Sequence, residues 1–197
     1  MDREIILMRH GQPALVAGKK KVSALDMQGW INGYNRAGII DQPVPAASLQ
    51  LATRARVIVS STAPRALSSL QALGLEPSHV DALFCEAQLP YGQWRLPRLS
   101  PSTWAFILRL LWLCGYSRDV ETVSAARLRA SMAAQRLLSL ASEGPVLLLG
   151  HGLMNRMIAR QLMAHGWTRR SHNGSHYWSA VVLAKRIDSP TRTGEAR

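Results

Sequence analysis

The 197-residue chain has few cysteines, few acidic residues and no long apolar segment. Its two cysteines, Cys85 and Cys114, lie in no metal-binding spacing, so we expect buried free thiols rather than a disulfide or a zinc site. The longest apolar stretch, residues 104–114, contains Arg109 and is too short to span a membrane. No basic leader precedes the first apolar residues. These absences predict a cytoplasmic protein without a membrane span.

Acidic residues are half as frequent as basic ones, because 12 Asp and Glu stand against 24 Lys and Arg, of which only 4 are Lys. The resulting net charge of +12 and the excess of arginine favour phosphate-bearing partners. The arginines are scattered along the whole chain, without a basic helix, a zinc-finger spacing or an RNA-binding signature. We therefore expect a small phosphorylated substrate or a phosphoprotein as the partner, and no specific nucleic-acid binding.

Five segments are expected to be β-strands, with helical patterns between them. The expected strands cover residues 4–8, 56–60, 80–85, 145–150 and 177–186. The expected helices cover residues 46–54, 63–73, 101–114, 122–142 and 153–165. This alternation predicts an α/β fold, a three-layer sandwich whose central sheet is mostly parallel and carries helices on both faces. The direction of the last strand stays open.

Two segments are not expected to form regular structure. Residues 11–45 contain several glycines and prolines and are predicted to be a long loop, which in a compact domain is usually functional or mobile. The polar residues 188–197 are expected to be a disordered tail. Because 197 residues with 47% hydrophobic content suit one core, we expect a single catalytic domain over residues 1–187.

Three short motifs place phosphate chemistry at the ends of expected strands. Arg9, His10 and Gly11 follow the first strand, where an imidazole can attack phosphorus and a guanidinium can hold two phosphate oxygens. His151, flanked by glycines, follows the fourth strand, and a hydroxyl-rich loop after the second strand leads to Arg65 in the first turn of a helix. Because ligands of open α/β sheets bind at the carboxyl ends of the strands, we expect these side chains to converge.

These motifs resemble those of the histidine phosphatase superfamily, also called the phosphoglycerate mutase-like or acid phosphatase superfamily. Residues 8–12 resemble its nucleophile motif, residues 60–66 its second-arginine motif and residues 150–152 its second-histidine motif. The resemblance covers nearly the whole chain, in the family's order.

The resemblance implies that His10 becomes a phosphohistidine, which water then hydrolyses. Arg9, Arg65 and a protonated or hydrogen-bond-donating His151 would bind the phosphate, and no metal or cofactor is expected, because these groups can supply the positive charge that phosphoryl transfer needs. The two guanidinium groups should also lower the pKa of His10 and keep its ring neutral and nucleophilic.

A leaving alkoxide needs a proton, and the 12 acidic residues can be searched for its donor. Position along the chain leaves Asp26, Asp41 and Glu86, because Asp81 lies at the start of the third expected strand and Asp119 resembles a helix start. Glu86 follows that strand, where apolar neighbours favour the protonated form of a carboxyl group. The family's acid motif, a glutamate followed by glycine and tryptophan, points to the same residue. We therefore predict Glu86 as the general acid.

The sequence departs from the family around these motifs, because Pro13 and the segment 95–97 replace residues that are common there. The substrate therefore does not follow from the resemblance. We predict a metal-independent phosphatase acting on a phosphomonoester; the alternatives are a phosphoglycerate-mutase-like phosphotransferase and a non-catalytic phosphate-ligand-binding protein of the same fold. The apolar segment 104–112 is expected to pack in the core or to form a lid. Candidates for the mouth of the pocket are Trp30, Tyr34, Tyr91 and Trp94.

Overall fold

The computed structural model describes residues 3–15 and 20–186, and these residues build a six-stranded mixed sheet. The strand order is β3-β2-β4-β1-β6-β5; the first four are parallel, whereas β6 is antiparallel to β1 and β5 is antiparallel to β6. The strands are β1 (Arg3–Arg9), β2 (Val57–Ser60), β3 (His79–Val80), β4 (Val146–Gly150), β5 (Thr168–His172) and β6 (Ala180–Lys185). The predicted α/β fold class is confirmed.

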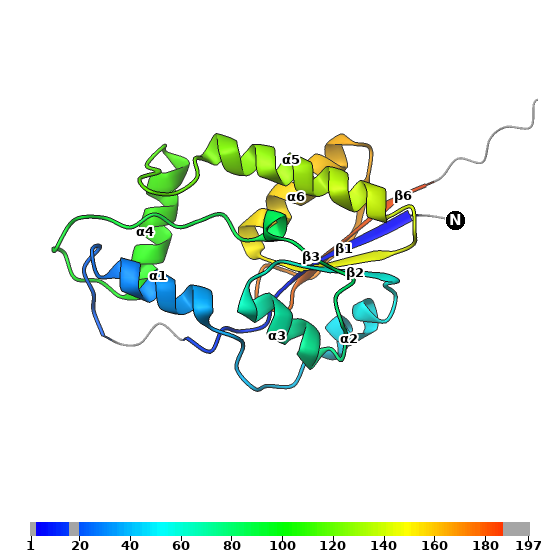
Figure 1. Cartoon of the computed structure of the whole chain (residues 1–197), viewed down its shortest axis with the longest axis horizontal. Helices are drawn as coiled ribbons and strands as arrows, with labels where there is room; N and C mark the ends of the chain where they lie inside the picture. Colours follow the sequence, from blue (N-terminus) through cyan, green and yellow to red (C-terminus); the bar gives the residue numbers. More distant parts are fainter. Residues whose placement is uncertain (1–2, 16–19, 187–197) are drawn as a thin grey trace, which may run out of the picture.

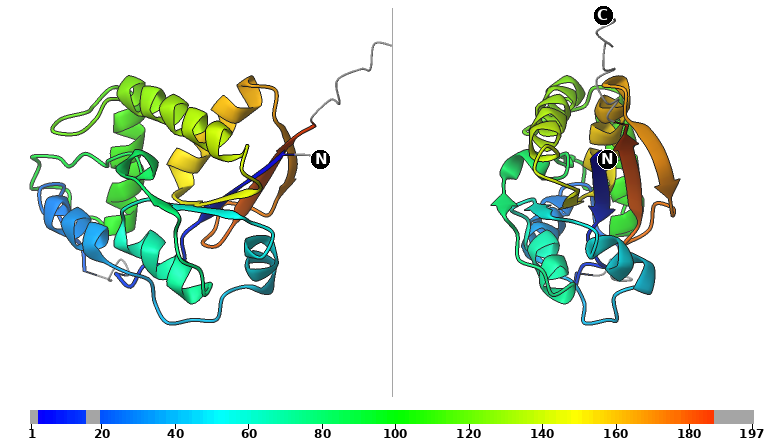
Figure 2. Two further views of the ribbon diagram at one scale, coloured as in Figure 1. Left: turned by 45° about the vertical axis from the view of Figure 1, so that its right-hand side comes forward. Right: turned by 90° about the vertical axis from the view of Figure 1, so that its right-hand side faces the viewer.

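Helices cover both faces of the sheet (Figures 1 and 2). Alternate residues of β1 point to opposite sides: Ile5 and Leu7 pack with α5 and α6, whereas Ile6 and Met8 pack with α2 and α3. This alternation gives two apolar layers, one on each side of a sheet whose central strands are fully buried. The helices are α1 (Met27–Arg36), α2 (Ala46–Ala52), α3 (Pro64–Ala72), α4 (Pro101–Leu113), α5 (Val123–Leu140) and α6 (Gly152–Ala164).

Helices α1 and α4 lie together at one end of the molecule, beyond the carboxyl ends of the parallel strands (Figure 1). Their contact is a separate apolar cluster in which Met27 of α1 packs with Trp104 and Leu108 of α4. Helix α4 begins as its sequence indicates: the Ser100 side chain accepts a hydrogen bond from the Thr103 backbone N–H group, and Pro101 opens the first turn. The segment 104–112 thus contributes to the core on one face only. None of the described helices is long and apolar enough to cross a membrane.

The structure corrects several boundaries. Residues 11–45 are not entirely irregular, because they contain α1. The third expected strand is only two residues long, and Ala82–Phe84 form a 3₁₀ turn whose start is capped by Asp81. Asp81 therefore follows the third strand instead of lying at its start. Strand β6 begins at Ala180, three residues later than expected.

Strand β5 was not expected from the sequence. All five of its residues are exposed, because it is an edge strand, so it carries no apolar pattern. The expected tail at residues 188–197 lies outside the described residues, and the single-domain boundary at residue 187 stays a prediction.

Candidate active site

The three predicted motifs meet at one edge of the sheet. Strands β1 and β4 are parallel neighbours with Arg9 paired to Gly150, so the histidines that follow them lie side by side. The His10 backbone N–H group donates to the Gly150 carbonyl oxygen at 3.1 Å, and the ring centroids of His10 and His151 are 5.1 Å apart in an edge-to-face arrangement. Because β2 pairs with the other side of β4, the loop after β2 brings Arg65 to the same place.

His10 is buried in its neutral form with a defined tautomer. Its Nδ1 atom lies 2.7 Å from the Gly11 carbonyl oxygen; since a carbonyl oxygen only accepts, Nδ1 carries the proton and the lone pair is on Nε2. Burial lowers the pKa of His10 to about 3, and the charges of Arg65 and Arg9 act in the same direction, against the opposing effect of the Gly11 hydrogen bond. The predicted direction is correct, but burial contributes more than the guanidinium groups.

His151 is fully buried, and burial followed by the positive charge of Arg65 holds its pKa well below the usual value. The ring is therefore neutral, so the hydrogen-bond-donating form is favoured over the protonated form that the sequence also allowed. Its Nε2 atom lies 2.8 Å from the Ser61 hydroxyl oxygen, and its Nδ1 atom has no hydrogen-bond partner among the described residues. The His151 backbone N–H group donates to the side chain of Asn155, which also donates to the Met8 carbonyl oxygen.

The guanidinium groups of Arg9 and Arg65 each pack against a tyrosine ring. The guanidinium of Arg65 lies 4.7 Å from the ring centroid of Tyr34, and that of Arg9 lies 4.5 Å from the ring centroid of Tyr177. Burial lowers the pKa of Arg65, which is only 4% exposed. In the described part of the chain, the buried Nε atoms of both arginines lack a hydrogen-bond partner. Arg65 is buried and Arg9 partly buried, and two neighbouring guanidinium groups with such unpaired Nε donors form a site for an anion.

Gly11 holds the end of β1 against α3. Its N–H group donates to the Ser69 hydroxyl oxygen at 2.9 Å, and that hydroxyl donates to the Arg65 carbonyl oxygen at 2.6 Å. A Cβ atom at residue 11 would lie 2.7 Å from the ring of Trp178, so only glycine fits here without displacing that ring. The motif at residues 8–12 therefore requires glycine at position 11 because the Trp178 ring lies so close.

Glu86 reaches the site, but its surroundings differ from those expected. Its two oxygens accept hydrogen bonds from the backbone N–H groups of Leu153 (3.0 Å) and Met154 (2.9 Å) at the start of α6, and from that of Ala87 (3.0 Å). Its carboxyl group therefore meets backbone donors at a helix N-terminus instead of the apolar groups expected from the sequence. The side chain of Arg109 in α4 holds the following loop by donating to the Ala87 carbonyl oxygen.

Of the other acidic residues, Asp119 lies on the wall of the site cavity, whereas Asp26 hydrogen-bonds to Ser23 and does not line it. The expectation that Asp119 starts a helix is wrong, because Thr122 caps the start of α5. Asp119 instead adopts a left-handed backbone conformation with φ of 57°, in the turn before that helix.

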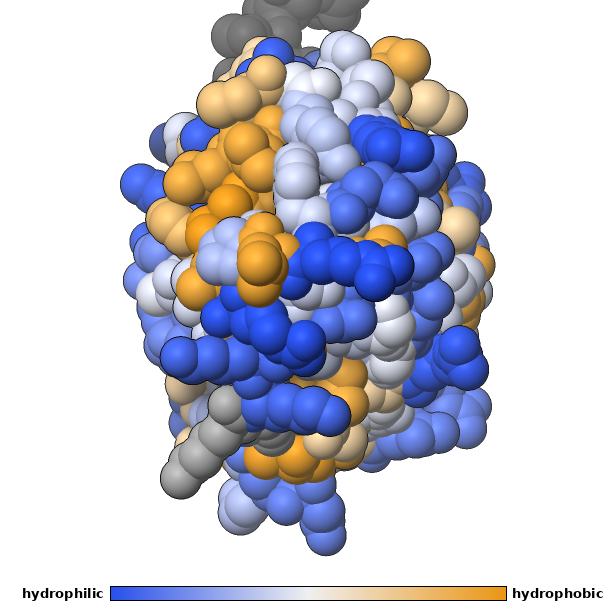
Figure 3. Space-filling view, turned by 90° about the vertical axis from the view of Figure 1, so that its left-hand side faces the viewer, coloured by the Kyte–Doolittle hydropathy of each residue, from blue (hydrophilic) through white to orange (hydrophobic). Residues whose placement is uncertain are grey.

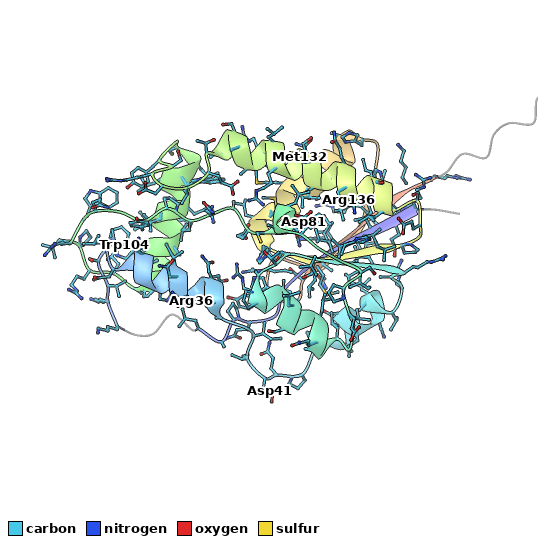
Figure 4. All side chains as sticks on the ribbon, in the orientation of Figure 1. Arg36, Asp41, Asp81, Trp104, Met132 and Arg136 are labelled. Atoms are coloured by element: carbon cyan, nitrogen blue, oxygen red, sulfur yellow. The ribbon has the colours of Figure 1, made fainter. Side chains whose placement is uncertain are left out.

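A cavity of about 1020 Å³ opens beside Arg65 and Glu86, between α1, α4, the start of α3 and the loop 85–91 (Figure 4). Of the aromatic residues predicted at its mouth, Trp30, Tyr34 and Tyr91 line it, but Trp94 does not.

Tyr177 also lines the cavity, with its ring centroid 5.8 Å from that of His10, although the buried His10 and His151 are not themselves in the lining. Nothing in the sequence distinguished Tyr177 from the other residues near the last strand. Within the described residues, no three His, Cys, Asp or Glu side chains gather closely enough to hold a metal ion.

The fold resembles those of several solved proteins at low sequence identity. A protein from Mycobacterium tuberculosis is 19% identical with a TM-score of 0.57, covering 91% of this chain and 90% of that one. A mycobacterial glucosyl-3-phosphoglycerate phosphatase is 22% identical with a TM-score of 0.55, covering 83% and 81%. A phosphoserine phosphatase from Entamoeba histolytica is 14% identical with a TM-score of 0.57, covering 91% and 89%. At these identities the likeness establishes the fold alone.

No curated protein matches the sequence. A family model does match it, over residues 5–186, and that range includes all three motifs and every strand except the first two residues of β1. The motifs meet at one sheet edge in the order that the resemblance implied. The chain belongs to branch 1 of the histidine phosphatase superfamily.

Proposed function

We propose that the protein is a metal-independent phosphatase that hydrolyses a phosphomonoester through a phosphohistidine at His10. The observation that carries this proposal is the state of the His10 ring: neutral, with its proton on Nδ1 and its lone pair on Nε2. It lies beside Arg9 and Arg65, whose buried Nε atoms have no partner among the described residues. A neutral imidazole is a nucleophile, and guanidinium groups stabilise the charge that spreads over the phosphate oxygens during transfer.

In the first step, Nε2 of His10 attacks phosphorus and the bond from phosphorus to the leaving oxygen breaks. The protonated carboxyl group of Glu86 transfers its proton to that oxygen, so the alcohol leaves neutral. In the second step, the Glu86 carboxylate takes a proton from a water molecule whose oxygen attacks phosphorus. The bond from nitrogen to phosphorus breaks, inorganic phosphate is released, and both His10 and Glu86 return to their starting states.

Arg9, Arg65 and His151 bind the phosphate during both steps. The two guanidinium groups supply positive charge without a metal ion, and His151 can donate a hydrogen bond from its ring while it stays neutral. A bound phosphate dianion would offset the arginine charges that now oppose protonation of His151. Arg65→Lys should therefore weaken inhibition by inorganic phosphate at least tenfold, because lysine lacks the planar pair of donors.

The phosphohistidine is the direct test of the mechanism. Reaction with 4-nitrophenyl phosphate for a few milliseconds, acid quench and mass spectrometry should locate a phosphoryl group on the peptide that contains His10. His10→Ala should abolish this adduct and the turnover, whereas His176→Ala, at an exposed position outside the site, should retain both. Turnover that survives in His10→Ala would refute the nucleophile, and turnover that is lost on chelation would refute the metal-independent mechanism.

The role of Glu86 can be separated from its structural hydrogen bonds by varying the leaving group. Glu86→Gln should slow hydrolysis of an alkyl phosphate by about 10²-fold or more, the usual contribution of a general acid. Hydrolysis of 4-nitrophenyl phosphate should be much less affected, because nitrophenolate leaves without a proton. An equal loss with both substrates would indicate that Glu86 only holds the loop to α6.

The same experiments distinguish the two alternatives. A phosphotransferase would pass the phosphoryl group to an added alcohol without releasing phosphate, and a binding protein would form no adduct. Family membership over residues 5–186 supports our further proposals of one catalytic domain over residues 1–187 and of a small phosphorylated substrate or a phosphoprotein as the partner. Free Cys85 and Cys114 support a reducing compartment, and we propose the cytoplasm, which fractionation of cells would test.

A further inference from the structure

The cavity beside the phosphate site indicates which alcohol the substrate carries. We propose that the protein acts on phosphomonoesters with a bulky, apolar alcohol portion, such as aryl or long-chain alkyl phosphates. This portion would bind between Trp30 of α1, Phe106 of α4 and Leu89 of the loop 85–91, all of which line the cavity. The inference rests on the proposed phosphatase function, because it places the phosphate against Arg65.

An aromatic series connects the cavity wall with the phosphate site. The rings of Trp30 and Tyr34 stack with centroids 5.3 Å apart and planes 22° apart, and the Tyr34 ring in turn faces the Arg65 guanidinium. The two aromatic residues are four positions apart on α1, so they share one face of the helix. An apolar group attached to a phosphate at Arg65 would therefore lie along a continuous aromatic surface.

Part of the opposite wall is apolar as well, between Ser102 and Arg109 of α4. Ala105 and Phe106 of α4 line the cavity, and Phe106 is 66% exposed, so the cavity opens to solvent at this helix. Hydrophobic residues gather on this end of the molecule next to strongly hydrophilic ones (Figure 3). An apolar ligand would cover the Phe106 ring and remove both surfaces from water, which favours binding.

The charges of the cavity do not suit a substrate with a second acidic group. Among its described lining residues, the cationic ones are Arg65 and Arg109. Arg109 already donates to the carbonyl oxygens of Ala87 and Gln88, and its guanidinium lies 4.9 Å from the ring centroid of Trp112. Asp119, the acidic lining residue besides the proposed proton donor Glu86, would repel a carboxylate. Once the phosphate of a phosphorylated acid had bound, its carboxylate would find no cationic side chain on these walls that is free of other interactions.

The size of the cavity points in the same direction. A phosphorylated three-carbon acid has roughly 11 non-hydrogen atoms, so even at the volume of a water molecule for each, about 30 Å³, it occupies about a third of the space. The cavity measures about 1020 Å³. The remaining volume, beside the Trp30 and Phe106 rings, is available to a larger alcohol.

A series of substrates tests the inference. We expect kcat/KM to rise about threefold for each methylene from ethyl to octyl phosphate, measured below the concentration at which octyl phosphate forms micelles, because each buried methylene contributes to binding. Phosphoserine, with its charged alcohol portion, should be poorer than ethyl phosphate. Equal kcat/KM along the alkyl series, or a preference for phosphoserine, would overturn the inference while leaving hydrolysis at His10 intact.

Substitutions in the two walls locate the effect. Trp30→Ala and Phe106→Ala should each lower the ratio of kcat/KM for octyl over ethyl phosphate at least tenfold. Leu128→Ala is the matched control, since Leu128 is 65% exposed, similar to Phe106, but lies on α5 outside the cavity. A ratio that falls equally in the control would overturn the assignment of this cavity.

Binding of phosphonates, which cannot be hydrolysed, separates the inference from the catalytic proposal. Calorimetry should show that octylphosphonate binds the wild type at least tenfold more tightly than ethylphosphonate does, and Phe106→Ala should reduce this preference. A preference for octylphosphonate in a protein that shows no turnover would support binding of the apolar group in the cavity and refute the phosphatase activity. Equal binding of the two phosphonates would overturn the inference whatever the turnover.

Discussion

The burial of His10 determines how the stability of this protein should respond to acid. Its pKa is 6.5 in an unfolded chain and about 3 in the folded protein. The unfolded state therefore binds the proton more readily, and the free energy of unfolding decreases as the pH falls below about 6.5. Between the two pKa values, each pH unit costs about 1.4 kcal/mol. From pH 7 to pH 5, His10 alone should reduce the free energy of unfolding by about 2 kcal/mol.

Substituting His10 with asparagine removes this titration. We expect the free energy of unfolding of His10→Asn to fall from pH 7 to pH 5 by about 2 kcal/mol less than that of the wild type. Carboxyl groups titrate in both proteins and cancel in the difference. His151, whose pKa is also lowered, retains its own contribution in both.

Urea unfolding at pH 7, 6 and 5, followed by circular dichroism, measures this difference. His176→Asn is the matched control, because this histidine is exposed, and it should have the pH dependence of the wild type. Nuclear magnetic resonance of the ring protons should in addition show no titration of His10 between pH 5 and pH 8. Parallel curves for His10→Asn and the wild type, or a ring that titrates near pH 6.5, would refute the neutral buried state.

Two further substitutions test how the site is held in place. Gly150→Ala should lower kcat at least tenfold and destabilise the protein by about 1–3 kcal/mol. The reason is that the added Cβ atom would lie 2.5 Å from the Asn155 Oδ1 atom, which accepts a hydrogen bond from the His151 N–H group. Wild-type kinetics and an unchanged Tm would contradict this prediction. Ser69→Ala should lower the free energy of unfolding, measured in urea, by about 1–3 kcal/mol, because the buried Gly11 N–H group loses its acceptor. A decrease below about 0.5 kcal/mol would show that this hydrogen bond is dispensable.

The helices and strands with strong apolar periodicity were predictable, and those without it were not. Strands β1, β2 and β4 are buried apolar runs, so their positions followed from the sequence. Helix α1 has two glycines and only Met27 buried, and it packs against α3 and α4, contacts that no local pattern reveals. Strand β5 is exposed throughout and exists because β6 supplies its partner.

The environment of Glu86 illustrates the same limit. Its position after an apolar segment suggested apolar surroundings, but the donors to its carboxyl group come from Leu153 and Met154, 67 and 68 residues away in the sequence. The sequence places Glu86 at the correct edge of the sheet. Which chain atoms surround it depends on where α6 begins relative to the loop.

The sequence by itself determined the chemical groups of the site, since Arg9, His10 and Gly11 are consecutive and follow a recognisable strand, and His151 repeats that arrangement. Only the tertiary structure decided the state of those groups. Burial makes both histidine rings neutral, and contacts across the sheet edge orient them. The aromatic cavity that we propose selects the alcohol arises because α1 and α4, some 70 residues apart, pack together. Local patterns specify side chains and periodicity, whereas solvent exposure and distance between remote residues exist only in the folded chain.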